Sequence, residues 1–230
     1  MAGIAALYLY DSALLLFHNE IVFELRRGGC RVSGGSVMEL RGRHLFVPHP
    51  CCPQRALVRL TWSPDGPSGS GTGTAIPRRL RMALAAIAPW TWALLSLFFA
   101  GLPCVLWFGT NASLLIWLLL TYLVIGAMLW RVYRHRRALN LSRRDFAALA
   151  FDALLCAPFA INVVRKISLR QRPSISLRGM ASSTLSPAET AALSAILRRK
   201  IEMSLGFLEP GTERSDGLIA YLKHFEGGQS

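Results

Sequence analysis

The stretch from Met82 to Trp130, MALAAIAPWTWALLSLFFAGLPCVLWFGTNASLLIWLLLTYLVIGAMLW, decides the fold class, because its 49 residues include no Asp, Glu, Lys, Arg or His. A helix on the surface of a soluble protein needs one polar face. A charge at the centre of a bilayer, in contrast, costs about 2.5–3.5 kcal/mol on the insertion scale. We therefore predict an integral membrane protein of the α-helical class.

The length of this block predicts two spans rather than one. A helix crosses the hydrocarbon core with about 20 residues, and the turn-forming residues FGTNAS at 108–113 divide the block into spans at about 83–107 and 113–130. Arginines precede the first span at 78–81 and follow the second at 131–137. Positive residues favour the cytoplasmic side, so both outer ends of this hairpin are expected in the cytoplasm.

The basic composition fits the same interpretation. A net charge of +13 could indicate a nucleic-acid partner, but the arginines gather at the ends of the apolar runs, where they would meet anionic lipid headgroups. We expect the bilayer, and no nucleic acid, to be the charged partner. The strong preference for Arg over Lys indicates a bacterial chain, so the expected location is the bacterial inner membrane, with several spans and a cytoplasmic C-terminus.

Residues 1–19 are expected to form an N-terminal transmembrane helix. The segment is apolar from Gly3 to about His18, but Asp11 stands near its middle. An interfacial or soluble packing of this segment is the alternative. The segment lacks the basic start and the cleavage site of a signal peptide, so we expect it to be retained.

Residues 20–62 are expected to form a small cytoplasmic β-rich segment. Short runs rich in Val, Leu and Phe alternate there with glycine pairs, a pattern typical of β-hairpins. Residues 63–81 follow as a flexible linker of Gly, Ser, Thr and Pro with a basic end.

Residues 131–172 contain a segment that is harder to assign. Phe146–Val164 is long enough to cross a bilayer, but it holds Asp152 and has basic residues on both flanks. Ser142 and Asp145 form a capping-box pattern, which predicts a helix from about Arg143. A crossing would leave the basic residues after Val164 on the outside. We therefore expect an interfacial or re-entrant helix here.

Residues 173–230 are expected to form a cytoplasmic helical tail. Ser186 and Glu189 make a second capping box, and the helix that follows has one apolar face. That face is the candidate partner-binding surface, made of Leu193, Leu197, Ile201, Leu205 and Leu208.

The candidate intramembrane polar residues are Asp11, His18 and Asp152. An ionisable group in a membrane segment indicates a functional role, such as a proton relay, although each acid could instead pair with an arginine or reach the headgroups. The window from His44 to Cys52 holds two histidines and two cysteines, but adjacent cysteines rarely chelate one ion together. We predict no catalytic residue, no cofactor and no metal site.

The sequence favours a non-catalytic subunit or scaffold that recruits a cytoplasmic or membrane partner, either another protein or a second copy of the chain. The alternative is a component of a membrane transporter or membrane-embedded enzyme that uses Asp11, His18 and Asp152. No catalytic motif supports an enzyme, and no motif identifies a biological process.

Overall fold

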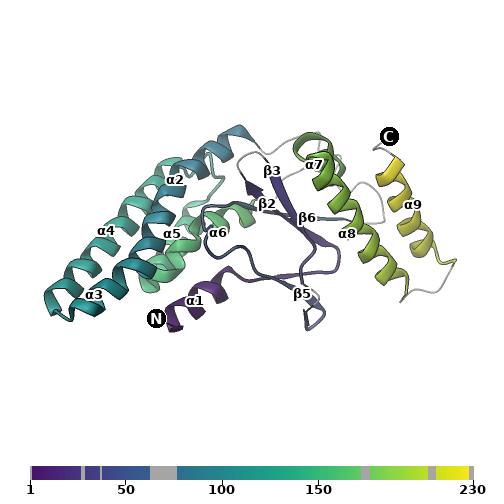
Figure 1. Cartoon of the computed structure of the whole chain (residues 1–230). Helices are drawn as coiled ribbons and strands as arrows, with labels where there is room; N and C mark the ends of the chain where they lie inside the picture. Colours follow the sequence, from purple (N-terminus) through teal and green to yellow (C-terminus); the bar gives the residue numbers. More distant parts are fainter. Residues whose placement is uncertain are drawn as a thin grey trace. The chain divides into compact units, whose positions relative to one another are not determined.

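The computed structural model describes residues 2–26, 29–36, 38–62, 77–171, 177–206 and 211–227. It divides into unit 1, made of Met1–Ala13, Val47–Ala56 and Pro77–Gln171, and unit 2, made of Leu14–Phe46, Leu57–Ile76 and Arg172–Ser230. The protein is mostly helical, with a small β segment (Figure 1). Two of its helical stretches, Arg78–Phe108 and Asn111–His135, are long and apolar enough to cross a membrane.

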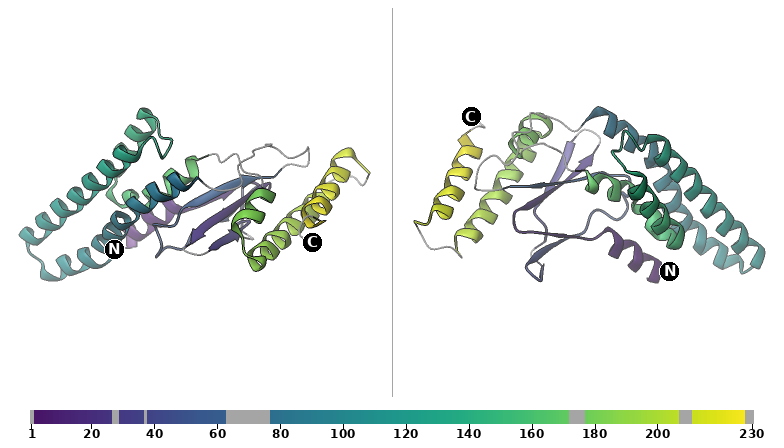
Figure 2. Two further views of the ribbon diagram at one scale, coloured as in Figure 1. Left: turned by 90° about the horizontal axis from the view of Figure 1, so that it is seen from above. Right: turned by 180° about the vertical axis from the view of Figure 1, so that it is seen from behind.

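A helical hairpin forms about half of unit 1 (Figures 1 and 2). Its elements are α2 (Arg78–Ser96), the π-helical turn η1 (Leu97–Gly101), α3 (Leu102–Phe108) and α4 (Asn111–His135). The first arm ends because Gly109 adopts a left-handed conformation with φ 65°, and Thr110 then caps α4 by accepting a hydrogen bond from the Ser113 N–H. The predicted break between the two apolar helices is therefore confirmed.

The π-turn η1 lies where Pro103 interrupts the hydrogen-bond ladder of the first arm, because proline has no N–H to donate. The Leu102 N–H donates to the Leu97 carbonyl, five residues back. The same carbonyl accepts a second hydrogen bond, of 2.8 Å, from the Trp117 indole on α4. The two arms are thus joined at one backbone oxygen.

One face of each arm is buried along the hairpin. The buried residues are Leu80, Ala83, Leu84, Ile87, Thr91 and Leu94 on α2, and Thr121, Ile125, Met128, Leu129 and Val132 on α4. The two threonine hydroxyls donate to carbonyls of their own helices, at Ala88 and Trp117. This interface is therefore apolar and has its polar groups satisfied.

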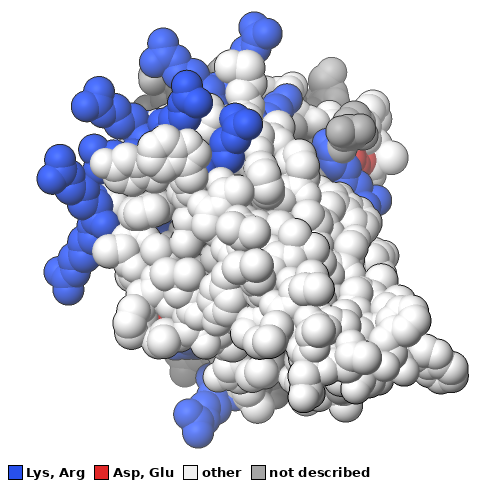
Figure 3. All heavy atoms as spheres, turned by 90° about the vertical axis from the view of Figure 1, so that its left-hand side faces the viewer, with Lys and Arg blue, Asp and Glu red and all other residues white. Residues whose placement is uncertain are grey.

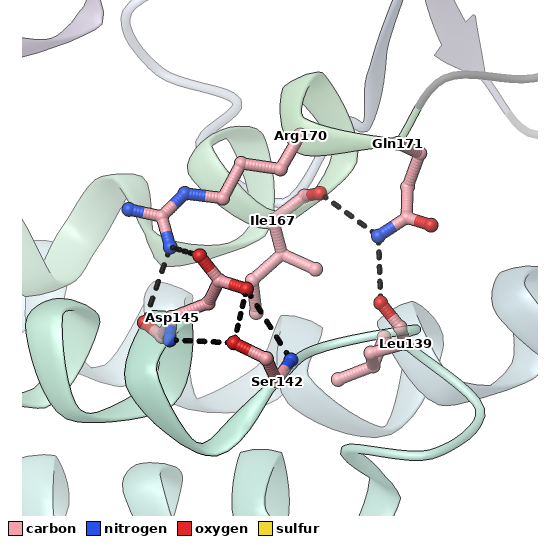
Figure 4. A network of polar contacts seen from close by, with 6 residues as sticks. All are labelled: Leu139, Ser142, Asp145, Ile167, Arg170 and Gln171. Carbon is pink, nitrogen blue, oxygen red and sulfur yellow. Dashed lines mark hydrogen bonds and ion pairs between the residues drawn. The ribbon is translucent and has the colours of Figure 1, made fainter.

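A second, shorter hairpin packs beside the first. It consists of α5 (Arg143–Leu155), the 3-10 turn η2 (Ala157–Asn162) and α6 (Val163–Arg170). The Ser142–Asp145 capping box that starts α5 is present as predicted. At the same end of this hairpin, the Arg170 guanidinium at the end of α6 lies 3.7 Å from the Asp145 carboxylate, and the Gln171 amide donates to the Leu139 carbonyl at 2.6 Å (Figure 4). Because α6 ends where α5 begins, the two helices run antiparallel.

Helix α1 (Ala2–Ser12) packs on η2, also within unit 1. It differs from the transmembrane helix expected over residues 1–19, because the chain leaves the helix after Ser12 and enters strand β1 at Leu14. Its 11 residues extend about 16 Å. That is roughly half of a hydrocarbon core about 30 Å thick.

Unit 2 contains two three-stranded antiparallel sheets. One has the order β1 (Leu14–Leu16), β5 (Arg43–Phe46), β4 (Glu39–Leu40), and the other has the order β3 (Gly29–Ser33), β2 (Glu20–Arg26), β6 (Leu57–Thr61). The expected β-rich segment is thus built of strands, and β1 adds residues that were assigned to the N-terminal span. Ile21, Val22 and Phe23 are fully buried in the central strand β2.

Three helices complete unit 2, namely α7 (Leu177–Thr184), α8 (Pro187–Leu205) and α9 (Glu213–Gly227). Helix α8 lies against β3, and α9 lies against α8 (Figures 1 and 2). The predicted Ser186–Glu189 capping box is present, and the same Glu189 carboxylate accepts a hydrogen bond from the Cys30 N–H of β3. The linker predicted after Trp62 falls at 63–76, outside the described residues.

Candidate functional site

The two long helices of unit 1 leave most of their apolar side chains uncovered. In each, 22% of the most apolar 18-residue window is buried, whereas the core helix of a soluble protein is mostly buried. On α4 the most exposed aliphatic side chains are Leu115 at 67%, Ile116 at 65%, Leu119 at 63% and Leu123 at 61%. The corresponding side of the molecule carries a broad area without charged residues (Figure 3). A contiguous exposed apolar surface of this kind is typical of membrane or protein interaction sites.

Basic side chains gather at the open end of the hairpin, where α2 begins and α4 ends. We call this group the basic rim; it consists of Arg78, Arg79, Arg81, Arg131, Arg134, Arg136, Arg137, Arg143 and Arg144. Lys and Arg gather mainly along one border of the uncharged area (Figure 3). Asp145 lies beside the rim. The hydrogen bonds from the hydroxyl and the backbone N–H of Ser142, followed by the charges of Arg170 and Arg144, lower the pKa of its carboxyl.

Arg165 on α6 is the largest buried polar side chain of unit 1, with 2% of its surface exposed. Its Nη2 donates to two carbonyls of the 47–56 loop, those of His49 at 2.6 Å and Cys52 at 3.0 Å. Its Nη1 donates to the Asn162 side chain at 3.1 Å and to the Tyr8 hydroxyl at 3.4 Å. The planar fork of a guanidinium suits such convergent acceptors. Arg165 therefore ties α1, η2 and the loop to α6.

Lys166, the next residue, links the two acidic residues that the sequence singled out. Its amine lies 2.8 Å from the Asp11 carboxylate and 4.0 Å from that of Asp152, and it stands 4.7 Å from the centre of the Phe159 ring. The Asn162 amide also donates to Asp11, at 3.1 Å. We call Tyr8, Asp11, Asp152, Asn162, Arg165 and Lys166 the α6 polar cluster. Its two cations balance its two carboxylates.

Of the three predicted intramembrane residues, the structure brings together Asp11 and Asp152, while His18 belongs to unit 2. There the His18 ring Nε2 is 2.7 Å from the Lys200 carbonyl and 2.7 Å from the Ser204 hydroxyl. The Lys200 amine in turn donates to the carbonyls of His18 and Glu20. Burial lowers the pKa of Lys200 to about 8. His18 thus helps to hold α8 against the start of β2.

Sequence reasoning missed Arg165 and Lys166, which were counted only as flanking positive charges. A signal was present in their spacing. Asn162, Arg165 and Lys166 stand three and four residues apart, which places the three on one helical face. The acceptors on the 47–56 loop are more than 100 residues away in the sequence, and no local pattern indicates them.

The apolar face of α8 that was proposed to bind a partner packs inside unit 2. Leu193, Leu197 and Ile201 are each 0% exposed, and the helix lies so close to β3 that a Cβ added at Gly34 would stand 2.8 Å from the Lys200 side chain. Leu205 is half-buried, and Leu208 lies outside the described residues. This face is therefore part of a core, and the three buried leucine and isoleucine side chains are not exposed to a partner.

The metal-type residues of the His44–Cys52 window do not form a ligand cluster. Across the described part of the chain, no group of three or more His, Cys, Asp or Glu side chains could hold a metal ion. Cys51 is exposed and Cys52 half-buried, and the loop that carries them is held through its carbonyls by Arg165.

Comparison of the chain with protein-family models, with curated proteins and with solved structures finds no match.

Proposed function

We propose that the chain is an integral protein of the bacterial inner membrane and acts as a non-catalytic subunit or scaffold. In this proposal the α2–α4 hairpin is the anchor, and unit 2 is held on the cytoplasmic side. The observation that carries it is the exposed apolar surface of the hairpin next to the basic rim. Each exposed Leu or Ile of α4 gains roughly 1–2 kcal/mol when lipid covers it, and the rim meets anionic headgroups at about 1 kcal/mol per residue.

The contacts of the second hairpin support a re-entrant arrangement. Arg170 and Gln171 return to Asp145 and Leu139 beside the basic rim, while the Tyr122 hydroxyl of α4 donates to the Leu154 carbonyl at the far end of α5. Tyr122 lies about 20 Å along α4 from His135, at 1.5 Å per residue. The α5–η2–α6 segment thus enters beside α4 and turns back, and α1 packs on it as a half-length helix.

The test is a combination of membrane extraction and topology mapping. In a cysteine-free version of the chain expressed in a bacterial host, Asn111→Cys, Ala138→Cys and Leu169→Cys are introduced one at a time. We expect the protein to stay in the membrane pellet after extraction with alkaline carbonate. We also expect an impermeant thiol reagent to label position 111 on intact spheroplasts, and positions 138 and 169 only after permeabilisation. A protein released by carbonate refutes the anchor, and outside labelling of position 169 refutes the re-entrant segment.

The alternative, a transporter or membrane-embedded enzyme that uses Asp11, His18 and Asp152, has less support from the geometry. Asp11 is 10% exposed and ion-paired with Lys166, and His18 hydrogen-bonds within unit 2. A proton carrier needs a carboxylate that can exchange protons with water. The alternative would be established if vesicles that contain the protein show a proton flux. Asp152→Asn should then abolish this flux while the variant stays integrated in the membrane.

A further inference from the structure

Helix α5 carries an exposed stripe that the rest of the described chain does not cover. It consists of Ala147, Ala148, Phe151, Asp152 and Leu155. These positions are spaced by one and four residues and therefore share one side of the helix. Phe151 is 64% and Leu155 70% exposed, while Leu149 and Ala153 on the opposite side are 1% exposed. We call this surface the α5 stripe.

A carboxylate interrupts this otherwise apolar stripe. The Asp152 side chain is 49% exposed, and its ion pair with Lys166 measures 4.0 Å. The same amine holds Asp11 at the shorter distance of 2.8 Å. Asp152 therefore shares a cation that binds another acid more closely, and about half of its side chain stays exposed.

The position of Asp152 along α5 makes its exposure costly. It lies seven residues beyond Asp145, about 10 Å further along the helix from the basic rim. With the proposed topology, this places a half-exposed carboxylate below the headgroups, where charged side chains pair with one another. Its ion pair with Lys166 is shared with Asp11 and measures 4.0 Å, so a closer cation would stabilise it further. The two alanines one turn nearer the rim leave room for the backbone of another helix to approach closely.

We propose that the α5 stripe binds a transmembrane helix of a partner protein that presents a lysine or arginine at the depth of Asp152. This inference rests on the proposed membrane function. A second copy of the chain fits less well, because the cations of α6 at this depth are engaged. Lys166 is 20% exposed and bound to Asp11, and Arg165 is 2% exposed. A partner helix with its own cation gives Asp152 an ion-pair partner that it does not share, and it covers Phe151 and Leu155.

The experiment uses the full chain in vesicles of phosphatidylcholine and phosphatidylglycerol, with a donor fluorophore at Ala138→Cys in a cysteine-free background. The probes are two acceptor-labelled polyleucine transmembrane peptides that differ in one residue, lysine or leucine, about 10 Å below one headgroup layer. We expect the lysine peptide to bind on the order of tenfold more tightly than the leucine peptide. Asp152→Asn should remove this preference, Asp152→Glu should keep it, and Asp145→Asn at the rim is the matched control.

Equal binding of the two peptides, or a preference that persists in Asp152→Asn, overturns the inference. The inference is also overturned if donor- and acceptor-labelled copies of the chain show energy transfer that Asp152→Asn removes. A second copy of the chain would then cover the stripe. Carbonate extraction of the same vesicles separates the two proposals. Loss of the protein from the vesicles refutes the anchor and the stripe together, whereas an integrated protein without the peptide preference refutes the stripe alone.

Discussion

Replacing Arg165 with methionine should open the 47–56 loop while the hairpin stays folded. Methionine fills a similar volume but donates no hydrogen bond, so the His49 and Cys52 carbonyls lose the bonds of 2.6 and 3.0 Å that they accept from Nη2. A hydrogen bond to a charged group contributes about 1.5–3 kcal/mol net. We take the lower value for each, because His49 itself is exposed. The loop should then lose about 3 kcal/mol of local stability.

Amide hydrogen exchange of the full chain in lipid nanodiscs measures this loss directly. The Cys52 N–H donates to the His49 carbonyl and the Arg55 N–H to the Cys52 carbonyl, so both amides report on the loop. At 1.36 kcal/mol per tenfold, a loss of about 3 kcal/mol increases their exchange on the order of one hundredfold. Arg165→Lys should give an intermediate increase, because an ammonium keeps the charge but lacks the planar fork.

Arg170→Met is the matched control, five residues further along α6. The Arg170–Asp145 pair is 38% and 50% exposed on its two sides, and exposed ion pairs contribute at most about 1 kcal/mol. Its loss should leave the exchange of the 47–56 peptide nearly unchanged. If Arg165→Met and Arg170→Met have the same effect on this peptide, Arg165 does not hold the loop, and its burial needs another explanation.

Three further predictions concern both units. Because burial lowers the pKa of Lys200 to about 8, below the value near 10.4 of an unfolded lysine, the unfolded chain binds more protons between these pH values. The free energy of unfolding should therefore rise by about 2 kcal/mol between pH 8 and pH 10. Denaturant titrations measure this rise, which Lys200→Met should flatten and the exposed Lys223→Met should leave unchanged. Gly35→Ala should lower the melting temperature more than Gly42→Ala. Both glycines have a positive φ, but a Cβ at Gly35 would lie 2.6 Å from the Cβ of His44, whereas a Cβ at Gly42 would have no atom within 4 Å. Leu119→Asp, on the exposed face of α4, should reduce the fraction of protein recovered in membranes, whereas Phe108→Asp at the end of α3 should not; equal recovery of the two variants would contradict the proposed anchor.

The features that the sequence predicted correctly depend on local chemistry. The charge-free block from Met82 to Trp130 could be divided at a turn because glycine and an N-capping threonine act on their own neighbours. The capping boxes at Ser142 and Ser186 likewise involve residues three apart. For these elements, periodicity and capping residues were sufficient.

The features that were missed depend on contacts between distant segments. The 3.6-residue repeat of α8 identified its apolar face but could not indicate what covers it, and the structure places β3 there. Arginine is usually a surface residue. Arg165 is buried because its guanidinium donates to backbone carbonyls that lie 113 and 116 positions away in the sequence. The apolar residues of the N-terminus suggested a span, but Leu14–Leu16 pair instead with β5.

The contacts of α1 also affect the order in which the protein can be made. Asp11 hydrogen-bonds to Asn162, a residue 151 positions later, and its ion-pair partner Lys166 follows four residues after that. At roughly 5–20 residues per second of synthesis, α1 leaves the ribosome about 8–30 seconds before its partners exist. The hairpin of α2 and α4 is complete within that interval. Helix α1 is therefore synthesised long before the residues that it contacts, and it can dock only after η2 and α6 have been translated.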